Sequence, residues 1–190
     1  MSIVGLLLAA GSATRFGSDK LSHRLPHGVP IAVQAARHLT SQISRVVAVL
    51  RPGSQELLGQ LKAEGCEVAL CENAAEGMGA SLACAAHAAG KADGYLVALG
   101  DMPFVRPSSI AAVREALAAG APLVAPYFRA RRGHPVGIAG RFFDDLVALR
   151  GDEGAKQLFS KHDVKKIPVG DPGVIRDIDT PDDLTPPLKV

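Results

Sequence analysis

Residues 3–20 read IVGLLLAAGSATRFGSDK, an apolar run that gives way abruptly to a loop of small residues. A short, continuously apolar run is typical of a strand that is buried on both faces of a parallel sheet. The loop after it carries two cations, Arg15 and Lys20. Because successive N–H groups of small residues can surround phosphate oxygens, we expect the loop to bind an anion. The loop lacks both the GxxxxGK[ST] spacing of a Walker A phosphate-binding loop and the GxGxxG spacing of a dinucleotide-binding loop. The alternative is an ordinary strand-to-helix turn with two solvated cations.

The same alternation continues along the chain. Further short apolar runs predict strands at Arg45–Leu50, Glu67–Leu70 and Gly94–Gly100. Proline start signals and glycine stop signals predict the intervening helices, which are Pro30–Leu39, Gln55–Glu64, Ala80–Ala89 and Ser108–Ala119. Strands that alternate with helices indicate an α/β sandwich around a parallel sheet. A length of 190 residues fits one domain, residues 1–190.

The last third of the chain is less regular. The basic turn RARRG (129–133) lies between two apolar runs and predicts a hairpin or a strand–loop–strand unit. We expect a helix over Arg141–Leu149, a strand at VKKIPV (164–169) and a short final helix that begins at Pro181. Thr180 would cap that helix, with Asp183 at the capping-box position.

Composition excludes several classes of protein. The formal net charge of +2 is too small to indicate a nucleic-acid or membrane-surface protein. The three cysteines, Cys66, Cys71 and Cys84, are odd in number and lack a CxxC spacing, which predicts neither a disulfide framework nor a zinc site. The N-terminus has no basic segment before its apolar run, and that run is too short to cross a bilayer. We therefore expect a cytoplasmic protein with no nucleic-acid or membrane partner.

Two acidic motifs predict a metal site. Asp101 in GDMPF (100–104) follows a buried strand, where a carboxylate can bind Mg²⁺ together with substrate phosphates. It lies too early to cap the helix that follows. In RDIDTPDDL (176–184), Asp177 and Asp179 alternate, so in an extended segment they share one face. One of them could complete the site with Asp101, while Asp182 and Asp183 complement a helix dipole.

Two further motifs suggest ligand contacts. In ENAAEGMGASLACAA (72–86), Gly77 and Gly79 lead into a helix through Ser81, an arrangement that suits an anion or a closely approached ligand. A plain loop is the alternative. In RARRGHPVGIAG (129–140), the arginines could receive an anionic substrate or form a solvated tip, and His134 could be catalytic or structural.

Taken together, these motifs resemble a known family. LLLAAGSATRFGSDKL resembles the LAAGxGxRxGxxK signature of the MobA-like nucleotidyltransferases, with Ala13 in place of the usual second glycine. GMGASLA, GDMPFV, RRGHPVG, GDEGA and DIDTPDDL resemble the molybdenum cofactor cytidylyltransferases (MocA-like) of that family more than its guanylyltransferases. The resemblance covers Ile3 to Leu184.

The resemblance implies a Rossmann-like three-layer α/β fold with a mostly parallel central sheet. It also implies transfer of CMP from CTP to the phosphate of Mo-molybdopterin, with Mg²⁺ as cofactor. The products would be molybdopterin cytosine dinucleotide and pyrophosphate. An apo-molybdoenzyme of the xanthine oxidase family, or its chaperone, would be a partner.

The resemblance also implies roles for individual residues. The catalytic residues would be Arg15, Lys20 and Asp101, and the metal ligands Asp101, Asp177 and Asp179. The acceptor substrate would lie near Arg131, Arg132, His134 and the turn at 151–154. The nucleotide would contact the first loop and the second glycine-rich segment through Leu8, Ala9, Ala10, Gly11, Ser12, Ala13, Asn73, Gly79 and Ser81.

Two alternatives stay open. The first is a guanylyltransferase for the same cofactor, or a sugar-phosphate nucleotidyltransferase, with the same phosphate-binding residues and a different base or acceptor. The second is a non-catalytic chaperone that binds CTP and delivers the cofactor without releasing pyrophosphate.

Overall fold

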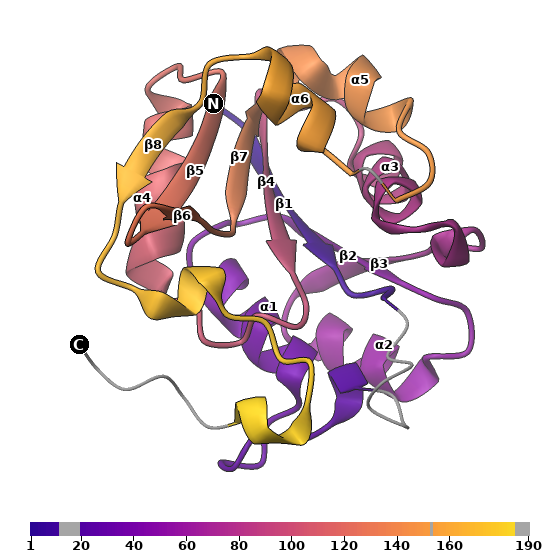
Figure 1. Cartoon of the computed structure of the whole chain (residues 1–190). Helices are drawn as coiled ribbons and strands as arrows, with labels where there is room; N and C mark the ends of the chain where they lie inside the picture. Colours follow the sequence, from indigo (N-terminus) through magenta and orange to yellow (C-terminus); the bar gives the residue numbers. More distant parts are fainter. Residues whose placement is uncertain (12–19, 153, 185–190) are drawn as a thin grey trace.

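The computed structural model describes residues 1–11, 20–152 and 154–184 (Figure 1). Its strands are β1 (Ile3–Leu8), β2 (Val46–Leu50), β3 (Cys66–Leu70), β4 (Gly94–Leu99), β5 (Leu123–Phe128), β6 (Arg131–Arg132), β7 (Val136–Ala139) and β8 (Lys165–Pro168). They form one sheet in the order β3-β2-β1-β4-β7-β5-β6, with β8 paired to β5. The four strands from β3 to β4 are parallel, and β7 runs antiparallel to both β4 and β5.

Helices cover both faces of this sheet (Figure 1). One face carries α1 (Ile31–Thr40), α2 (Gln55–Ala63) and α4 (Pro107–Ala118). The other carries α3 (Met78–Ala89), α5 (Phe143–Val147) and α6 (Lys156–Lys161). The structure confirms the predicted class, a three-layer α/β sandwich around a mostly parallel sheet.

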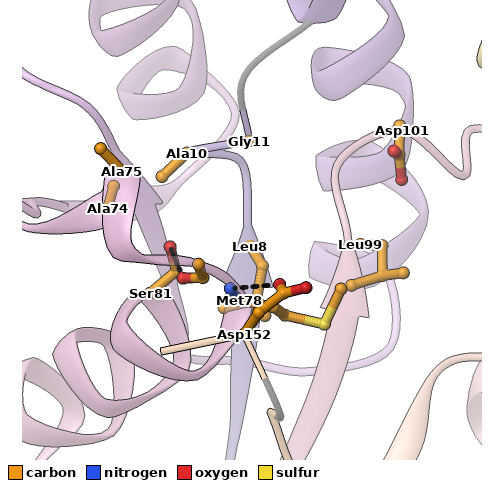
Figure 2. Close-up of a pocket in the computed structure, with 11 residues that line it drawn as sticks. Leu8, Ala10, Gly11, Ala74, Ala75, Met78, Ser81, Leu99, Asp101 and Asp152 are labelled. Atoms are coloured by element: carbon orange, nitrogen blue, oxygen red, sulfur yellow. Dashed lines mark hydrogen bonds between the residues drawn. The ribbon is translucent and has the colours of Figure 1, made fainter. Parts of the chain in front are cut away.

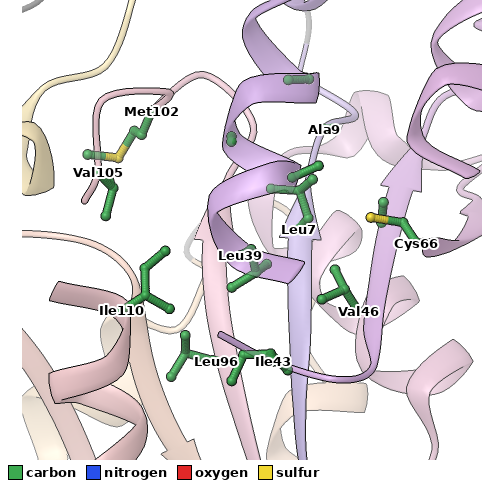
Figure 3. Close-up of a cluster of buried hydrophobic side chains, with 14 of the residues drawn as sticks. Leu7, Ala9, Leu39, Ile43, Val46, Cys66, Leu96, Met102, Val105 and Ile110 are labelled. Carbon is green, nitrogen blue, oxygen red and sulfur yellow. The ribbon is translucent and has the colours of Figure 1, made fainter. Parts of the chain in front are cut away.

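The central strand β1 belongs to two hydrophobic cores. Leu7 packs on the side of α1, where Figure 3 shows it near Leu39. Leu6 and Leu8 pack on the opposite side, with α3. Because successive side chains of a strand point to opposite faces, burial on both faces requires a continuous apolar run. This explains why IVGLLL lacks the polar alternation of a half-exposed strand.

The last third of the chain departs from the predicted elements in one place. The expected helix at Arg141–Leu149 is a 3-10 turn, Gly140–Phe142, followed by the short α5. The N–H of Gly140 donates to the carbonyl of Asp93 at 2.8 Å, and a Cβ on Gly140 would lie 2.0 Å from the Ala92 oxygen. This close contact with the segment before β4 fixes the backbone of Gly140, directly before the start of the expected helix.

The predicted hairpin is present. Strands β5 and β6 pair antiparallel, with Tyr127 opposite Arg132 and Phe128 opposite Arg131. Only Arg129 and Ala130 connect them, and both have positive φ, 46° and 64°. Two-residue hairpin loops require this left-handed geometry, which asparagine and glycine adopt more easily. Only half of the predicted capping box forms: the Asp183 carboxylate accepts from the backbone N–H of Thr180 at 2.9 Å, but the Thr180 hydroxyl donates to that carboxylate at 2.8 Å and does not cap the Asp183 N–H.

None of the helices within the described ranges combines the length and the apolar character that a membrane span requires.

The buried hydroxyl of Tyr95 offers a test of the core. It donates to the carbonyl of Gly90 at 2.7 Å and accepts from the N–H of Ala92 at 3.0 Å, which ties the end of α3 to the start of β4. We expect Tyr95→Phe to lower the free energy of unfolding by about 1–3 kcal/mol, because two backbone groups lose their partner. Urea denaturation measures this change.

Tyr127→Phe is the matched control. The Tyr127 ring lies 5.4 Å from the ammonium group of Lys166, a contact that phenylalanine keeps. This variant should stay within about 0.5 kcal/mol of the wild type. Equal effects of the two substitutions would contradict the role assigned to the Tyr95 hydroxyl.

Candidate active site

The candidate site lies at the carboxyl ends of β1 and β4. These strands pair in register, with Leu8 opposite Leu99, so the segments that follow them start side by side. The N–H of Gly100 continues the ladder by donating to the carbonyl of Leu8 at 2.8 Å. In parallel α/β sheets this edge is where ligands bind.

Three carboxylates meet at this edge. Asp101, Asp177 and Asp179 each offer an oxygen, and these oxygens lie within 4.8 Å of one another. The backbone N–H of Ile178 donates to the carbonyl of Asp101 at 2.9 Å, and the Ile178 side chain is fully buried. The neighbours of Ile178 on either side are therefore both presented outward, as their alternation predicted.

Lys20, in the 3-10 helix η1 (Lys20–Ser22), lies between two of these carboxylates. Its Nζ is 3.0 Å from Asp101 Oδ2 and 3.2 Å from Asp179 Oδ1. Burial favours the neutral amine, but the two carboxylates outweigh burial and raise the pKa of Lys20. The side chain is therefore an ammonium ion at neutral pH. Against three carboxylates, one ammonium leaves negative charge that suits a divalent cation with oxygen ligands.

A pocket of about 230 Å³ lies beside the acidic cluster (Figure 2). Asp101 and Leu99 form one side of it, and the α3 N-terminus forms the other. Its lining comes from four parts of the chain: Leu8, Ala10, Gly11, Ala74, Ala75, Gly77, Met78, Ser81, Leu99, Asp101 and Asp152. The side chains of the walls are mostly small or apolar, and Ser81, Asp101 and Asp152 supply polar groups.

Gly77 and Gly79 let the turn at 150–152 close one wall of this pocket. A Cβ on Gly77 would lie 2.6 Å from the Cα of Asp152, and a Cβ on Gly79 would lie 2.7 Å from the Arg150 carbonyl oxygen. The Gly79 N–H donates to the Gly151 carbonyl at 2.8 Å. Asp152 Oδ1 accepts from the N–H of Met78 at 3.2 Å, as Figure 2 shows.

The structure gathers most of the expected nucleotide-binding residues that it describes. Leu8, Ala10, Gly11 and Ser81 line the pocket. Ala9 is buried in the core behind it. Gly79 lies against the turn at 150–152 rather than in the pocket lining. Ser12, Ala13 and Arg15 lie outside the described residues.

Asn73 lies elsewhere. Its Oδ1 is the hydrogen-bond partner of the Cys71 thiol at 3.2 Å. It lines a separate, open depression on the outer side of α3, together with Leu70 and His87. Nothing in the linear sequence separates Asn73 from the pocket residues. Its position follows from the 3-10 helix η2 (Ala74–Glu76), which places Ala74 and Ala75 toward the pocket.

The residues expected near the acceptor substrate do not line this pocket. Arg131 and Arg132 are exposed on β6, and the Arg132 guanidinium lies 5.1 Å from the Phe159 ring centre. His134 borders a separate, very small cavity, about 10 Å³, that His38 also borders. Burial lowers the pKa of His134 to about 4, against the opposing effects of a hydrogen bond with the Val97 backbone and of Asp177. Its imidazole is therefore neutral at pH 7.

Asp152 is the main pocket residue outside the expected nucleotide set. The motif GDEGA pointed only to a turn near the acceptor. The pair of glycines in GMG was the sequence signal that could have indicated this contact. A glycine allows close approach to its backbone, and the approaching group can be another segment of the chain as readily as a ligand.

The comparisons with known proteins agree with this geometry. A model of the MobA-like NTP transferase domain matches residues 5–166. The chain is 27% identical over 195 residues to the purine catabolism protein PucB of Bacillus subtilis (strain 168), covering 95% of this chain and 93% of PucB. The crystal structure of Rv0371c from Mycobacterium tuberculosis H37Rv superposes with a TM-score of 0.81 at 26% identity, covering 96% and 94% of the two chains.

A more distant structure shares the fold. It is the molybdopterin-guanine dinucleotide biosynthesis protein A from Archaeoglobus fulgidus, with a TM-score of 0.67 at 22% identity over 95% and 94% of the chains. The family match begins within β1 and includes the α3 segment and Asp101, so it contains all of the residues that line the pocket. The chain therefore belongs to the family of MobA-like NTP transferase domains, and it is a nucleotidyltransferase.

Proposed function

We propose that this nucleotidyltransferase is a divalent-metal-dependent cytidylyltransferase that transfers CMP from CTP to the terminal phosphate of Mo-molybdopterin. The observation that carries the reaction type is the position of Asp101. It belongs both to the lining of the pocket and to the three-carboxylate cluster beside Lys20. A nucleotide in the pocket would therefore have its phosphates next to both the carboxylates and the ammonium group.

The choice of acceptor rests on the sequence motifs and on one relative. GMGASLA, RRGHPVG and GDEGA resemble the molybdenum cofactor cytidylyltransferases. PucB is named for purine catabolism, and xanthine, after which the xanthine oxidase family is named, is a purine. A dinucleotide cofactor made for an enzyme of that family would fit both observations. The apo-enzyme or its chaperone would then receive the product.

In the proposed reaction, a phosphate oxygen of Mo-molybdopterin attacks the α-phosphorus of CTP. The bond from this phosphorus to the oxygen that bridges to the β-phosphate breaks, and pyrophosphate leaves with the bond electrons. No covalent intermediate with the protein is required, so the protein acts by positioning and by stabilising charge. The backbone N–H groups from Ala10 to Ala13 and the Arg15 guanidinium would hold the β- and γ-phosphates.

The three carboxylates fit a hard divalent cation, because they supply clustered oxygen ligands and excess negative charge. We propose Mg²⁺, which when bound neutralises phosphate charge and orients the triphosphate for in-line attack. Asp101, Asp177 and Asp179 would hold it. Lys20 would donate to the α-phosphate oxygens as negative charge builds there.

Replacing Lys20 tests its part in the chemistry. We expect Lys20→Ala to lower kcat by about 10²–10³, the usual effect of removing one group that stabilises developing charge on oxygen. Steady-state pyrophosphate release with CTP and Mo-molybdopterin measures this. Lys62→Ala, on the exposed side of α2, is the control and should keep the wild-type rate. A wild-type kcat for Lys20→Ala would contradict the assignment.

Replacing Asp101 tests the metal site. Asp101→Asn keeps the shape of the side chain but removes its charge, so we expect metal-dependent turnover to be lost at ordinary Mg²⁺ concentrations. The measurement is the rate of pyrophosphate release as a function of Mg²⁺. Asp163→Asn, an exposed carboxylate before β8, should leave the Mg²⁺ dependence unchanged. Full activity of Asp101→Asn would exclude the metal role.

A nucleotide panel tests the substrate. Pyrophosphate release is measured with each of the four nucleoside triphosphates, with Mo-molybdopterin present and absent. We expect release with CTP that depends on the acceptor. Faster release with GTP would identify a guanylyltransferase instead. Binding of CTP with no release under any condition would identify the non-catalytic chaperone.

A further inference from the structure

Asp171 is a buried carboxylate that the proposed reaction does not use. Only 3% of its surface is exposed, and it is the one acidic residue that is buried among those the structure describes. Its Oδ2 accepts from the Arg106 N–H and from the Ser109 hydroxyl, both at 2.8 Å. Its Oδ1 accepts from the Gly173 N–H at 2.9 Å. A carboxylate is costly to bury, and such a set of donors is what offsets the cost.

These hydrogen bonds join two parts of the chain that lie far apart in sequence. Arg106 and Ser109 belong to the start of α4, while Gly173 belongs to the 3-10 helix η4 (Pro172–Ile175). The Arg106 guanidinium adds an ion pair at 3.7 Å. The Asp171 carboxylate therefore fixes η4 against the N-terminus of α4.

The helix η4 also touches the loops on both sides of the candidate site. A Cβ on Gly173 would lie 2.1 Å from the carbonyl oxygen of Phe104, three residues after Asp101. The carbonyl of Val174 accepts from the His134 N–H at 2.7 Å. The backbone of η4 thus lies in close contact with the loop that follows Asp101 and with the loop at 133–135.

The segment directly after η4 carries two of the three clustered carboxylates. Residues 176–179 form neither helix nor strand. The Arg176 N–H donates to the Gly173 carbonyl at 3.3 Å, the Ile178 N–H to the Asp101 carbonyl at 2.9 Å, and the Asp179 N–H to Asp183 Oδ2 at 3.2 Å. At its C-terminal end the segment is tied directly to Asp101 through Ile178, and at its N-terminal end the Arg176 N–H ties it to η4, so a displaced η4 would pull on Asp177 and Asp179 from that end.

We propose that Asp171 is a positioning residue of the metal site. Its buried carboxylate holds η4 so that Asp177 and Asp179 meet Asp101 at the spacing a divalent cation needs. This inference rests on the metal site of the proposed function. If η4 were not fixed, repulsion among the three carboxylates would be opposed by the Ile178 hydrogen bond and the Lys20 ion pairs alone, and we expect their spacing to widen.

The test is a titration of the protein with Mn²⁺, in which the electron paramagnetic resonance signal of the free ion measures how much Mn²⁺ is bound. Asp171→Asn keeps the shape of the side chain but turns one acceptor oxygen into a donor that faces a donor. We expect the Kd for Mn²⁺ to rise on the order of 10- to 100-fold, the usual effect of losing a group that orients metal ligands. Asp144→Asn, an exposed charge-matched control on α5, should keep the wild-type Kd.

The outcomes separate this proposal from the one on which it rests. A wild type that binds no Mn²⁺ would overturn the metal site itself. A wild type that binds Mn²⁺, with a folded Asp171→Asn variant that binds equally well, would overturn only the role of Asp171, even if its Tm falls. If Asp171→Asn does not fold, Ser109→Ala removes one donor and keeps the carboxylate. We then expect a several-fold weaker Kd, and an unchanged one would overturn the proposal.

Discussion

The pairing of β1 with β4 is the constraint on which the candidate site depends. Six residue pairs lie in register from Ile3 and Gly94 to Leu8 and Leu99, so both strands end at the same level. Beyond that level a Cβ on Gly100 would come within 3.0 Å of the Ala9 Cβ. The first loop and the Asp101 loop therefore leave the sheet in contact. A shift of the register by one residue would put a side chain in the place of Gly5, where a Cβ would lie 3.0 Å from Val46 Cγ2.

The charges at this edge impose a second constraint. Three carboxylates with oxygens inside 4.8 Å repel one another, and Lys20 offsets part of that repulsion through its two ion pairs. Ile178 also holds the cluster together. Its side chain is buried and its N–H donates to the Asp101 carbonyl, which keeps Asp177 and Asp179 beside Asp101. Among the described residues, the three carboxylates carry more negative charge than Lys20 offsets, an arrangement that favours binding of a divalent cation.

The parts of the site that could be predicted are those with a local pattern. IVGLLL predicted a doubly buried strand, GDMP predicted a carboxylate at a strand end, and the alternation in DID predicted two carboxylates on one face. Each prediction needs only the geometry of a strand or an extended segment. One of Asp177 and Asp179 was expected to complete a site with Asp101, and the structure brings all three residues together.

The parts that could not be predicted depend on contacts between distant segments. Asp152 reaches the pocket because Gly77 and Gly79, at the start of α3, have no Cβ and so leave room for the backbone of residues 150–152. Asn73 turns away because η2 begins directly after it. The hairpin tip keeps its two-residue loop with Arg129 and Ala130 in left-handed geometry, although neither residue favours it. No local pattern carries this information, because each case depends on the shape of a partner segment.

The residues on the two sides of the pocket differ in how freely they can be substituted. Asp101 and Lys20 sit on the shared edge of β1 and β4, where a substitution alters both the charge balance and the strand ends. The opposite wall of the pocket comes from Met78, Ser81 and Asp152, on a helix start and a turn that meet outside the sheet. Substitutions there reshape the pocket while leaving the carboxylate cluster intact. Within one fold, the reaction can therefore stay constant while the base or the acceptor differs.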